Sequence, residues 1–161
     1  MLKNFFVLVH ITLVIFFGTL SLESVGAEER HGHKAHHGGV LNVIGKEAGH
    51  LEILVQGETL EAWFVGGGQD TGRAVPIKVT EIPLTASLPG QGERTLVLKA
   101  APLKLAGEKV GHCSHVTAQA EWMRDVKAFE ARGEVVFKGV RQKLVIKYPE
   151  GYDPLHGPAV H

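Results

Sequence analysis

Short runs in which hydrophobic and polar residues alternate recur along most of the chain, and turn-forming residues separate them. In the run 50–56, Leu51, Ile53 and Val55 alternate with polar side chains. Successive side chains of a strand point to opposite faces, so this pattern predicts strands that bury one face. Further runs span residues 40–44, 59–65, 75–79, 84–88, 95–99, 112–120, 126–137 and 143–148. Seven to nine short antiparallel strands of this kind predict an all-β fold, a single immunoglobulin-like β-sandwich.

Two details of this pattern concern the second half of the chain. The last two runs meet at Lys138 and Gly139, which predicts a hairpin. The segment 121–132 fits two structures, because Trp122, Val126 and Phe129 also recur at helical spacing. We favour a strand for this segment and keep a helix as the alternative.

The first 27 residues have the three parts of a secretory signal. Lys3 provides a positive start, residues 5–22 are almost uninterruptedly apolar, and the segment 25–27 is a small-residue cleavage box. The alternative is a retained membrane anchor, since the apolar run is close to the length that spans a bilayer. We favour cleavage, which predicts a periplasmic protein that begins at Glu28 and does not insert into the membrane.

Composition divides the rest of the chain into a flexible, histidine-rich leader at 28–39, a β-sandwich at 40–150 and a tail at 151–161. Lysine and arginine number 17, and so do aspartate and glutamate, which leaves no net charge. The chain has no basic stripe for nucleic acid and no acidic block, so partners must be recognised through specific sites.

Histidine is the anomaly of this composition, with ten residues against two tyrosines and two tryptophans. Four of them crowd the leader, namely His31, His33, His36 and His37. Such a cluster binds Zn, Cu or Ni without marked selectivity. The alternative is a leader whose histidines bind nothing.

The single cysteine lies between histidines, in the segment 111–115. If residues 112–120 form a regular strand, Cys113 and His115 share a polar face and can bind one ion together. If 112–115 is a turn, His112 and His115 converge instead. Cys113 can also be a small buried hydrophobic residue.

A second pair of candidate ligands lies on the run 50–56. Alternation places His50 and Glu52 on the face opposite the apolar side chains. Together with Cys113 and His115, they would complete a four-coordinate site if the two strands were neighbours. Signatures of nucleophilic hydrolases, zinc proteases and phosphate-binding loops are missing, so we expect no enzyme.

The His-Gly-Gly-Val segment at 37–40 and the Gly-His-Leu-Glu segment at 49–52 resemble a known pattern. They are similar to a small periplasmic β-sandwich domain that occurs alone or fused to the adaptor subunits of heavy-metal efflux systems. The resemblance covers about residues 36–65, and the hairpin near 126–148 more loosely. It implies metal handling in the cell envelope and marks His37, His50 and Glu52 as the matching positions. The segment 112–115 is not part of that pattern.

The sequence therefore predicts a periplasmic protein that binds a transition metal, Cu or Zn in the first place and Ni or Co as alternatives. It would serve metal resistance, buffering or delivery to a heavy-metal efflux complex. The alternative function is a non-catalytic module that docks on an envelope partner and whose histidines are incidental.

Overall fold

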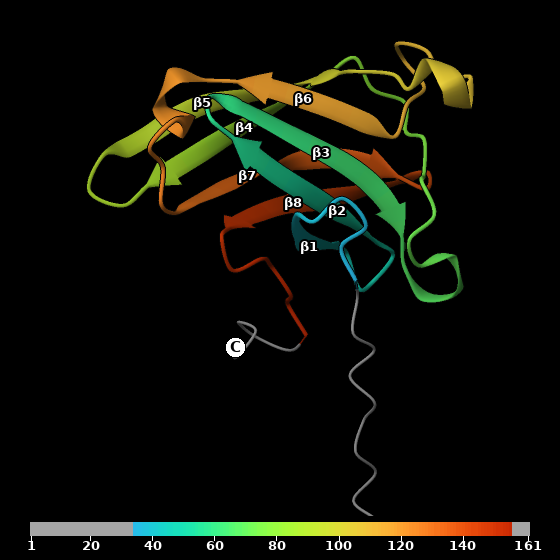
Figure 1. The fold of residues 1–161 in the computed structure, drawn as a ribbon. Coiled ribbons are helices and arrows are strands. Elements are labelled where there is room, and N and C mark those ends of the chain that lie inside the picture. Colours follow the sequence, from blue (N-terminus) through green and yellow to red (C-terminus); the bar gives the residue numbers. More distant parts are fainter. Residues whose placement is uncertain (1–33, 156–161) are drawn as a thin grey trace, which may run out of the picture. The chain divides into compact units, whose positions relative to one another are not determined.

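The computed structural model describes residues 34–155, and they form an all-β fold without α-helices (Figure 1). Its strands are β1 (Val40–Ile44), β2 (Gly49–Gln56), β3 (Thr59–Gly66), β4 (Glu81–Leu88), β5 (Gly92–Ala100), β6 (His115–Gln119), β7 (Phe129–Phe137) and β8 (Val140–Tyr148). Three single 3-10 turns interrupt the connections, namely η1 (Gly68–Asp70), η2 (Lys104–Ala106) and η3 (Glu121–Met123). The prediction of an all-β sandwich with seven to nine strands is confirmed.

All eight strands belong to one antiparallel sheet in the order β1-β2-β3-β6-β5-β4-β7-β8. In Figure 1, β3 and β6 cross the upper part of the domain, while β7 and β8 cross the lower part. The two outermost strands come together, because the backbone N–H of Lys147 in β8 donates to the side-chain oxygen of Asn42 in β1 at 2.8 Å. The sheet is therefore nearly closed, with Asn42 at its seam.

The predicted boundary between domain and tail at residue 150 is wrong by two residues. The N–H of Val43 donates to the carbonyl oxygen of Tyr152 at 2.6 Å, and the N–H of Tyr152 donates to that of Leu41 at 3.3 Å. Residues 151–152 therefore pair with β1, and the domain extends beyond 150. Residues 156–161 of the predicted tail lie outside the described residues.

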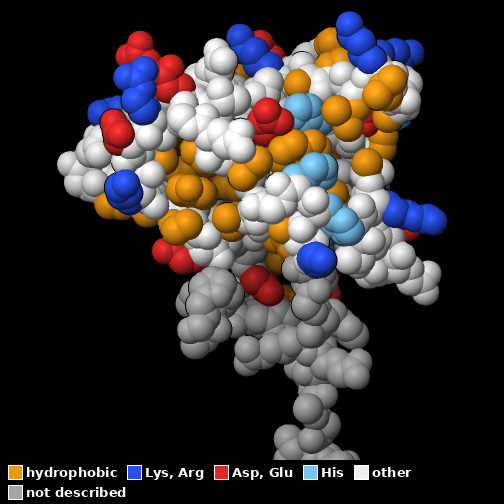
Figure 2. Space-filling model, viewed as in Figure 1, with side chains coloured by type: hydrophobic (Ala, Val, Ile, Leu, Met, Phe, Trp, Pro, Cys, Tyr) orange, Lys and Arg blue, Asp and Glu red, His pale blue; other side chains and the backbone are white. Residues whose placement is uncertain are grey.

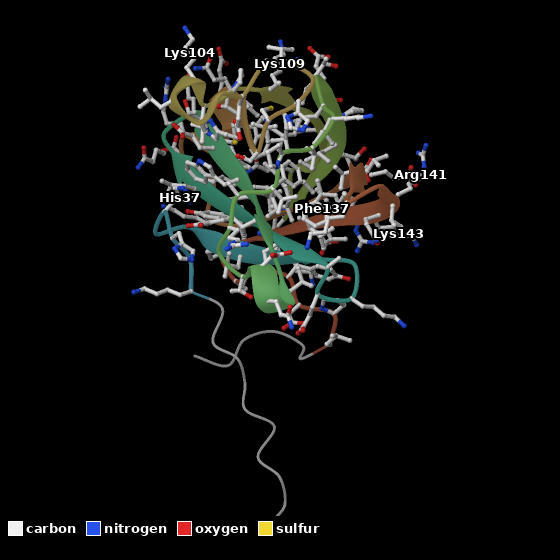
Figure 3. All side chains as sticks on the ribbon, turned by 90° about the vertical axis from the view of Figure 1, so that its right-hand side faces the viewer. His37, Lys104, Lys109, Phe137, Arg141 and Lys143 are labelled. Atoms are coloured by element: carbon white, nitrogen blue, oxygen red, sulfur yellow. The ribbon has the colours of Figure 1, made fainter. Side chains whose placement is uncertain are left out.

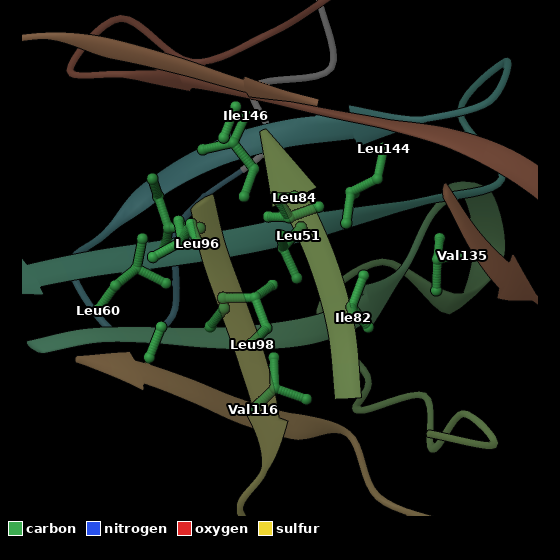
Figure 4. Packing of buried hydrophobic residues seen from close by; sticks show 14 of the residues in the cluster. Leu51, Leu60, Ile82, Leu84, Leu96, Leu98, Val116, Val135, Leu144 and Ile146 are labelled. Carbon is green, nitrogen blue, oxygen red and sulfur yellow. The ribbon is translucent and has the colours of Figure 1, made fainter. Parts of the chain in front are cut away.

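Alternation generates the core, as β4 illustrates. Its exposed and buried positions alternate strictly, and Ile82, Leu84, Ala86 and Leu88 point inward. Figure 4 shows Ile82 and Leu84 among buried side chains from other strands, such as Leu51, Leu98 and Ile146. Each of the larger side chains among them, such as leucine or isoleucine, contributes about 1.5–3 kcal/mol of hydrophobic stabilisation when fully buried.

The hairpin predicted between the last two runs is confirmed. Lys138 and Gly139 both have positive φ, at 48° and 81°. Two left-handed residues in succession form the turn whose twist matches a two-residue hairpin. A tight turn also joins Gln56 of β2 to Thr59 of β3.

Two of the predicted strands differ from the structure. Residues 75–79 form no strand, since Pro76 lacks an N–H, and only Ile77 makes a bridge, to Cys113. The segment 121–132 is neither a continuous strand nor a helix. It begins with η3, which buries Met123, and β7 starts only at Phe129.

The predicted signal at 1–27 lies outside the described residues. Within residues 34–155, no helix has the length and apolar character needed to cross a bilayer.

Candidate functional site

The register of three neighbouring strands places one residue of each in a row on the outer face of the sheet. Glu52 of β2 lies opposite Trp63 of β3, and Trp63 lies opposite His115 of β6. Histidine side chains gather in a column among hydrophobic ones on the face shown in Figure 2. The candidate site is centred on this row of Glu52, Trp63 and His115.

Glu52 holds the end of the leader against β2. Its fully buried carboxylate accepts hydrogen bonds from the backbone N–H groups of His36 at 3.0 Å, His37 at 2.6 Å and Gly39 at 3.0 Å. It also accepts one from Nδ1 of the His37 ring at 2.9 Å. The predicted flexibility of the leader is therefore wrong for residues 36–39, which this carboxylate orders. Residues 28–33 lie outside the described part of the chain.

The two glycines after His37 make this arrangement sterically accessible. Gly38 has a φ of +74°, in the left-handed region that L side chains rarely adopt. A Cβ on Gly39 would clash with the carbonyl oxygen of Ile53. The turn at Gly38 and the close approach of Gly39 to the backbone of β2 thus allow three backbone N–H groups to converge on the Glu52 carboxylate, beside the His37 ring.

The hydrogen bonds decide the charge state of Glu52. Burial alone would raise the pKa of this carboxyl, because it disfavours the charged form. The hydrogen bonds from the His37 side chain and from the backbone of Gly39, His37 and His36 outweigh it, so that the pKa lies below its ordinary value. Glu52 is therefore ionised at neutral pH.

The His37 ring lies flat on the indole of Trp63, with ring centroids 4.0 Å apart and an interplanar angle of 4°. Its Nδ1 faces Glu52, and its side chain is 39% exposed. Figure 3 shows His37 on the outside of the strands. His36 is exposed as well, and its ring lies against Gly72.

His115 packs near the same indole from β6, with centroids 5.0 Å apart and planes inclined by 15°. Since Glu52 and His115 flank Trp63 on opposite sides in the register, the indole separates the His115 ring from that of His37. Nδ1 of His115 lies 2.8 Å from the carbonyl oxygen of Ala101. Its Nε2 lies 3.2 Å from a carboxylate oxygen of Glu61.

The predicted placement of Cys113 beside His115 on a polar face is wrong. Cys113 is fully buried in the core, and its thiol donates to the carbonyl oxygen of His115 at 3.3 Å. Strict alternation fails here because β6 begins only at His115, while Cys113 makes an isolated bridge to Ile77. Burial, and then the charge of Glu108, raise the pKa of the thiol. A thiol in this environment is a poor source of thiolate.

We expect the Cys113 thiol to resist alkylation in the folded protein, since the reagent needs an exposed thiolate. Labelling with iodoacetamide at pH 8 should be at least about 100-fold slower in buffer than in urea, because reaction waits for opening of the core. The measurement is the mass shift against time. Equal rates in the two conditions would show that the thiol is accessible.

The other predicted ligands do not join one cluster. His50 is buried in β2, with 1% of its surface exposed, and His112 is exposed on the connection before β6. His31 and His33 lie outside the described residues. Within residues 34–155, no three histidine, cysteine, aspartate or glutamate side chains are placed to hold one ion. What the structure does bring together is His37 with Glu52.

Sequence reasoning did not identify Trp63 and Glu61 as parts of the site. The signal for Trp63 was present, because a hairpin that joins Gln56 to Thr59 fixes Glu52 opposite Trp63. Glu61 follows from the same register, two residues before Trp63 on the same face. Its contact with His115 depends on the pairing of β3 with β6, which are distant in the sequence.

No protein-family model, curated protein or solved structure matches this chain. The similarity of the segments 37–40 and 49–52 to the efflux-associated domain stays a prediction.

Proposed function

We propose that the protein binds a transition metal in the periplasm and serves metal buffering, resistance or delivery to a heavy-metal efflux complex. The first ligand of the proposed site is Nε2 of His37. The remaining ligands come from the histidines that precede it in the leader, namely His31, His33 and His36.

The observation that carries this proposal is the hydrogen bond between His37 and the buried carboxylate of Glu52. Histidines that bind metals commonly donate their second ring N–H to a carboxylate or carbonyl, which fixes the tautomer and the orientation of the ring. Here Nδ1 donates to Glu52 at 2.9 Å, so the neutral ring carries its lone pair on Nε2. A second-shell carboxylate of this kind strengthens metal binding by the histidine that it holds.

The position of His37 explains how a leader could bind an ion at a defined place. A free histidine-rich tail pays the full entropic cost of ordering when it binds. In this chain, Glu52 and the Trp63 ring already order residues 36–39. Binding of an ion therefore requires ordering of only the part of the leader that precedes His36, since His36 and His37 already have fixed positions. Imidazole ligands suit Zn, Cu and Ni ions.

The test is calorimetric titration of the chain 28–161 with Zn(II), Cu(II), Ni(II) and Co(II), and with Cu(I) under reductant. The variant His37→Phe keeps an aromatic ring for Trp63 and removes Nε2. We expect the wild-type chain to bind at least one ion. His37→Phe should bind it about 10–100-fold more weakly, the range that is typical when the second-shell partner of a metal ligand is removed. The exposed His112 provides the control, since His112→Phe should bind as wild type does.

A wild-type protein that binds none of these ions would overturn the proposal and favour the docking module. Equal affinities of wild type and His37→Phe would remove His37 from the site.

A further inference from the structure

We propose that His115 and Glu61 form a second transition-metal site, separated from His37 by the indole of Trp63. This inference rests on the proposed function, because it concerns a further ion of the same kind. It differs in its residues, which lie on the strands β6 and β3 and not on the leader.

The distance between the two ligand atoms fits one ion. Bonds from zinc to histidine nitrogen and carboxylate oxygen are about 2.0–2.2 Å long, so two ligands of a tetrahedral ion lie about 3.3 Å apart. Nε2 of His115 and the nearer oxygen of Glu61 are 3.2 Å apart. The pair can thus bind an ion with little movement of either side chain.

The hydrogen bond of His115 Nδ1 leaves Nε2 as the ring atom that can bind a metal. Its Nδ1 faces the carbonyl oxygen of Ala101 at 2.8 Å, and a carbonyl oxygen only accepts, so Nδ1 carries a hydrogen. In the neutral tautomer that carries this hydrogen, the lone pair lies on Nε2, the atom that faces the Glu61 carboxylate. Without a metal, a hydrogen bond or ion pair between His115 and Glu61 closes this contact. A metal ion that replaces it has the second-shell carbonyl that metal-binding histidines commonly have.

One ion cannot be shared between the two sites. The centroids of the His37 and His115 rings lie 4.0 Å and 5.0 Å from the indole, on opposite sides of it. Bonds of about 2 Å from one ion cannot span two stacking distances. The sheet therefore presents two separate sites, each beside the same tryptophan.

The second site has two protein ligands and an open side. The side chain of His115 is 13% exposed and that of Glu61 is 42% exposed, so water or a donor from a partner can complete the coordination. An ion with open positions exchanges ligands more readily than one in a closed four-ligand site. This is the property that delivery to another protein requires.

The experiment isolates the second site in the full chain 28–161. In the background variant, His31, His33 and His36 are changed to Asn and His37 is changed to Phe, which removes every ligand of the first site. Into this background we introduce Glu61→Gln, His115→Gln or the control Glu58→Gln. Glu58 belongs to the same hairpin, but its carboxylate pairs with Arg124. Thermal unfolding without metal verifies that each variant folds.

We expect the background variant to bind one Zn(II) in calorimetry. Glu61→Gln and His115→Gln should each weaken this binding at least about tenfold, and Glu58→Gln should leave it unchanged. Cu(II) should quench the tryptophan emission of the background variant. Most of this Cu(II) quenching should disappear when Trp63→Phe is added to the background variant, because Trp63 is the tryptophan beside His115.

Three results separate the two proposals. If the wild-type chain binds ions but the background variant binds none, the second site is overturned and the first stands. If Glu61→Gln binds Zn(II) as tightly as the background, the second site is likewise overturned. If the wild-type chain binds no ion at all, the proposed function fails and this inference fails with it.

Discussion

Replacing Glu52 with alanine is expected to lower the free energy of unfolding by about 2–3 kcal/mol and to release residues 36–39 from the sheet. The carboxylate accepts four hydrogen bonds from this segment, and hydrogen bonds to a charged group are the stronger kind. The loss stays well below the sum of four bonds, because the detached N–H groups bind water. Urea unfolding measures the stability, and hydrogen exchange at the amides of His36 and Gly39 measures the release.

The same carboxylate should impose a pH dependence on stability. Its pKa in the folded protein lies below the ordinary value of 4.5, so the unfolded chain takes up a proton first as the pH falls. The stabilisation by Glu52 is therefore complete above the ordinary pKa and is lost as the pH falls through the lowered one. In Glu52→Gln, the decline of stability between neutral pH and about pH 3 should be shallower than in wild type.

The matched control for Glu52 is Glu108. Its pKa is lowered too, since the hydrogen bonds from Ser114 and from the backbone of Leu103 outweigh the effect of burial. Its hydrogen bonds come from Leu103 and Ser114 and not from residues 36–39. Glu108→Gln should therefore also flatten the acid decline, but leave the amides of His36 and Gly39 protected. Protected amides in Glu52→Ala would show that the leader is held by other contacts.

The second large effect is expected at the seam of the sheet. Asn42→Leu should lower the free energy of unfolding by about 1–3 kcal/mol, because it leaves a part-buried backbone N–H, that of Lys147, without its acceptor. It also removes the donor that lies 3.4 Å and 3.5 Å from the carbonyl oxygens of Val40 and Leu51. Urea unfolding gives the loss of stability, and faster exchange at the Lys147 amide locates it.

Thr117→Val provides the comparison for Asn42, since the hydroxyl of Thr117 donates one hydrogen bond to the carbonyl oxygen of Leu60. That carbonyl has a second lone pair, so we expect a loss of about 1 kcal/mol or less. Losses of equal size in the two variants would mean that the seam contributes no more than an ordinary side-chain hydrogen bond.

Local patterns predict most of this fold, since most of the runs in which hydrophobic and polar residues alternate form strands. The two-residue turn after Gln56 also fixes the register of β2 against β3, and with it the pairing of Glu52 with Trp63. That Trp63 meets His115 depends on the pairing of β3 with β6, about 50 residues further along the chain. No local pattern contains this long-range contact.

Alternation misled the prediction where the backbone is irregular. It assigned Cys113 and His115 to one polar face, but Cys113 is buried in the core because the regular strand β6 begins only at His115. It assigned Glu52 to a polar face, which is correct for the strand. It could not show that residues 36–39 would cover that face and bury the carboxylate. The position of a covering segment depends on tertiary contacts and not on the period of the strand beneath it.

The two ends of the domain also determine how it can be combined with other proteins. Gly39 contacts β2 through its hydrogen bond to Glu52, and Tyr152 pairs with the adjacent strand β1. Entry to and exit from the fold are therefore neighbours on one margin of the sheet. Domains with adjacent ends tolerate insertion into a host loop or fusion at either end, since neither join has to thread through the core. The arrangement of its ends is therefore compatible with fusion of the whole domain to another protein or its insertion into one.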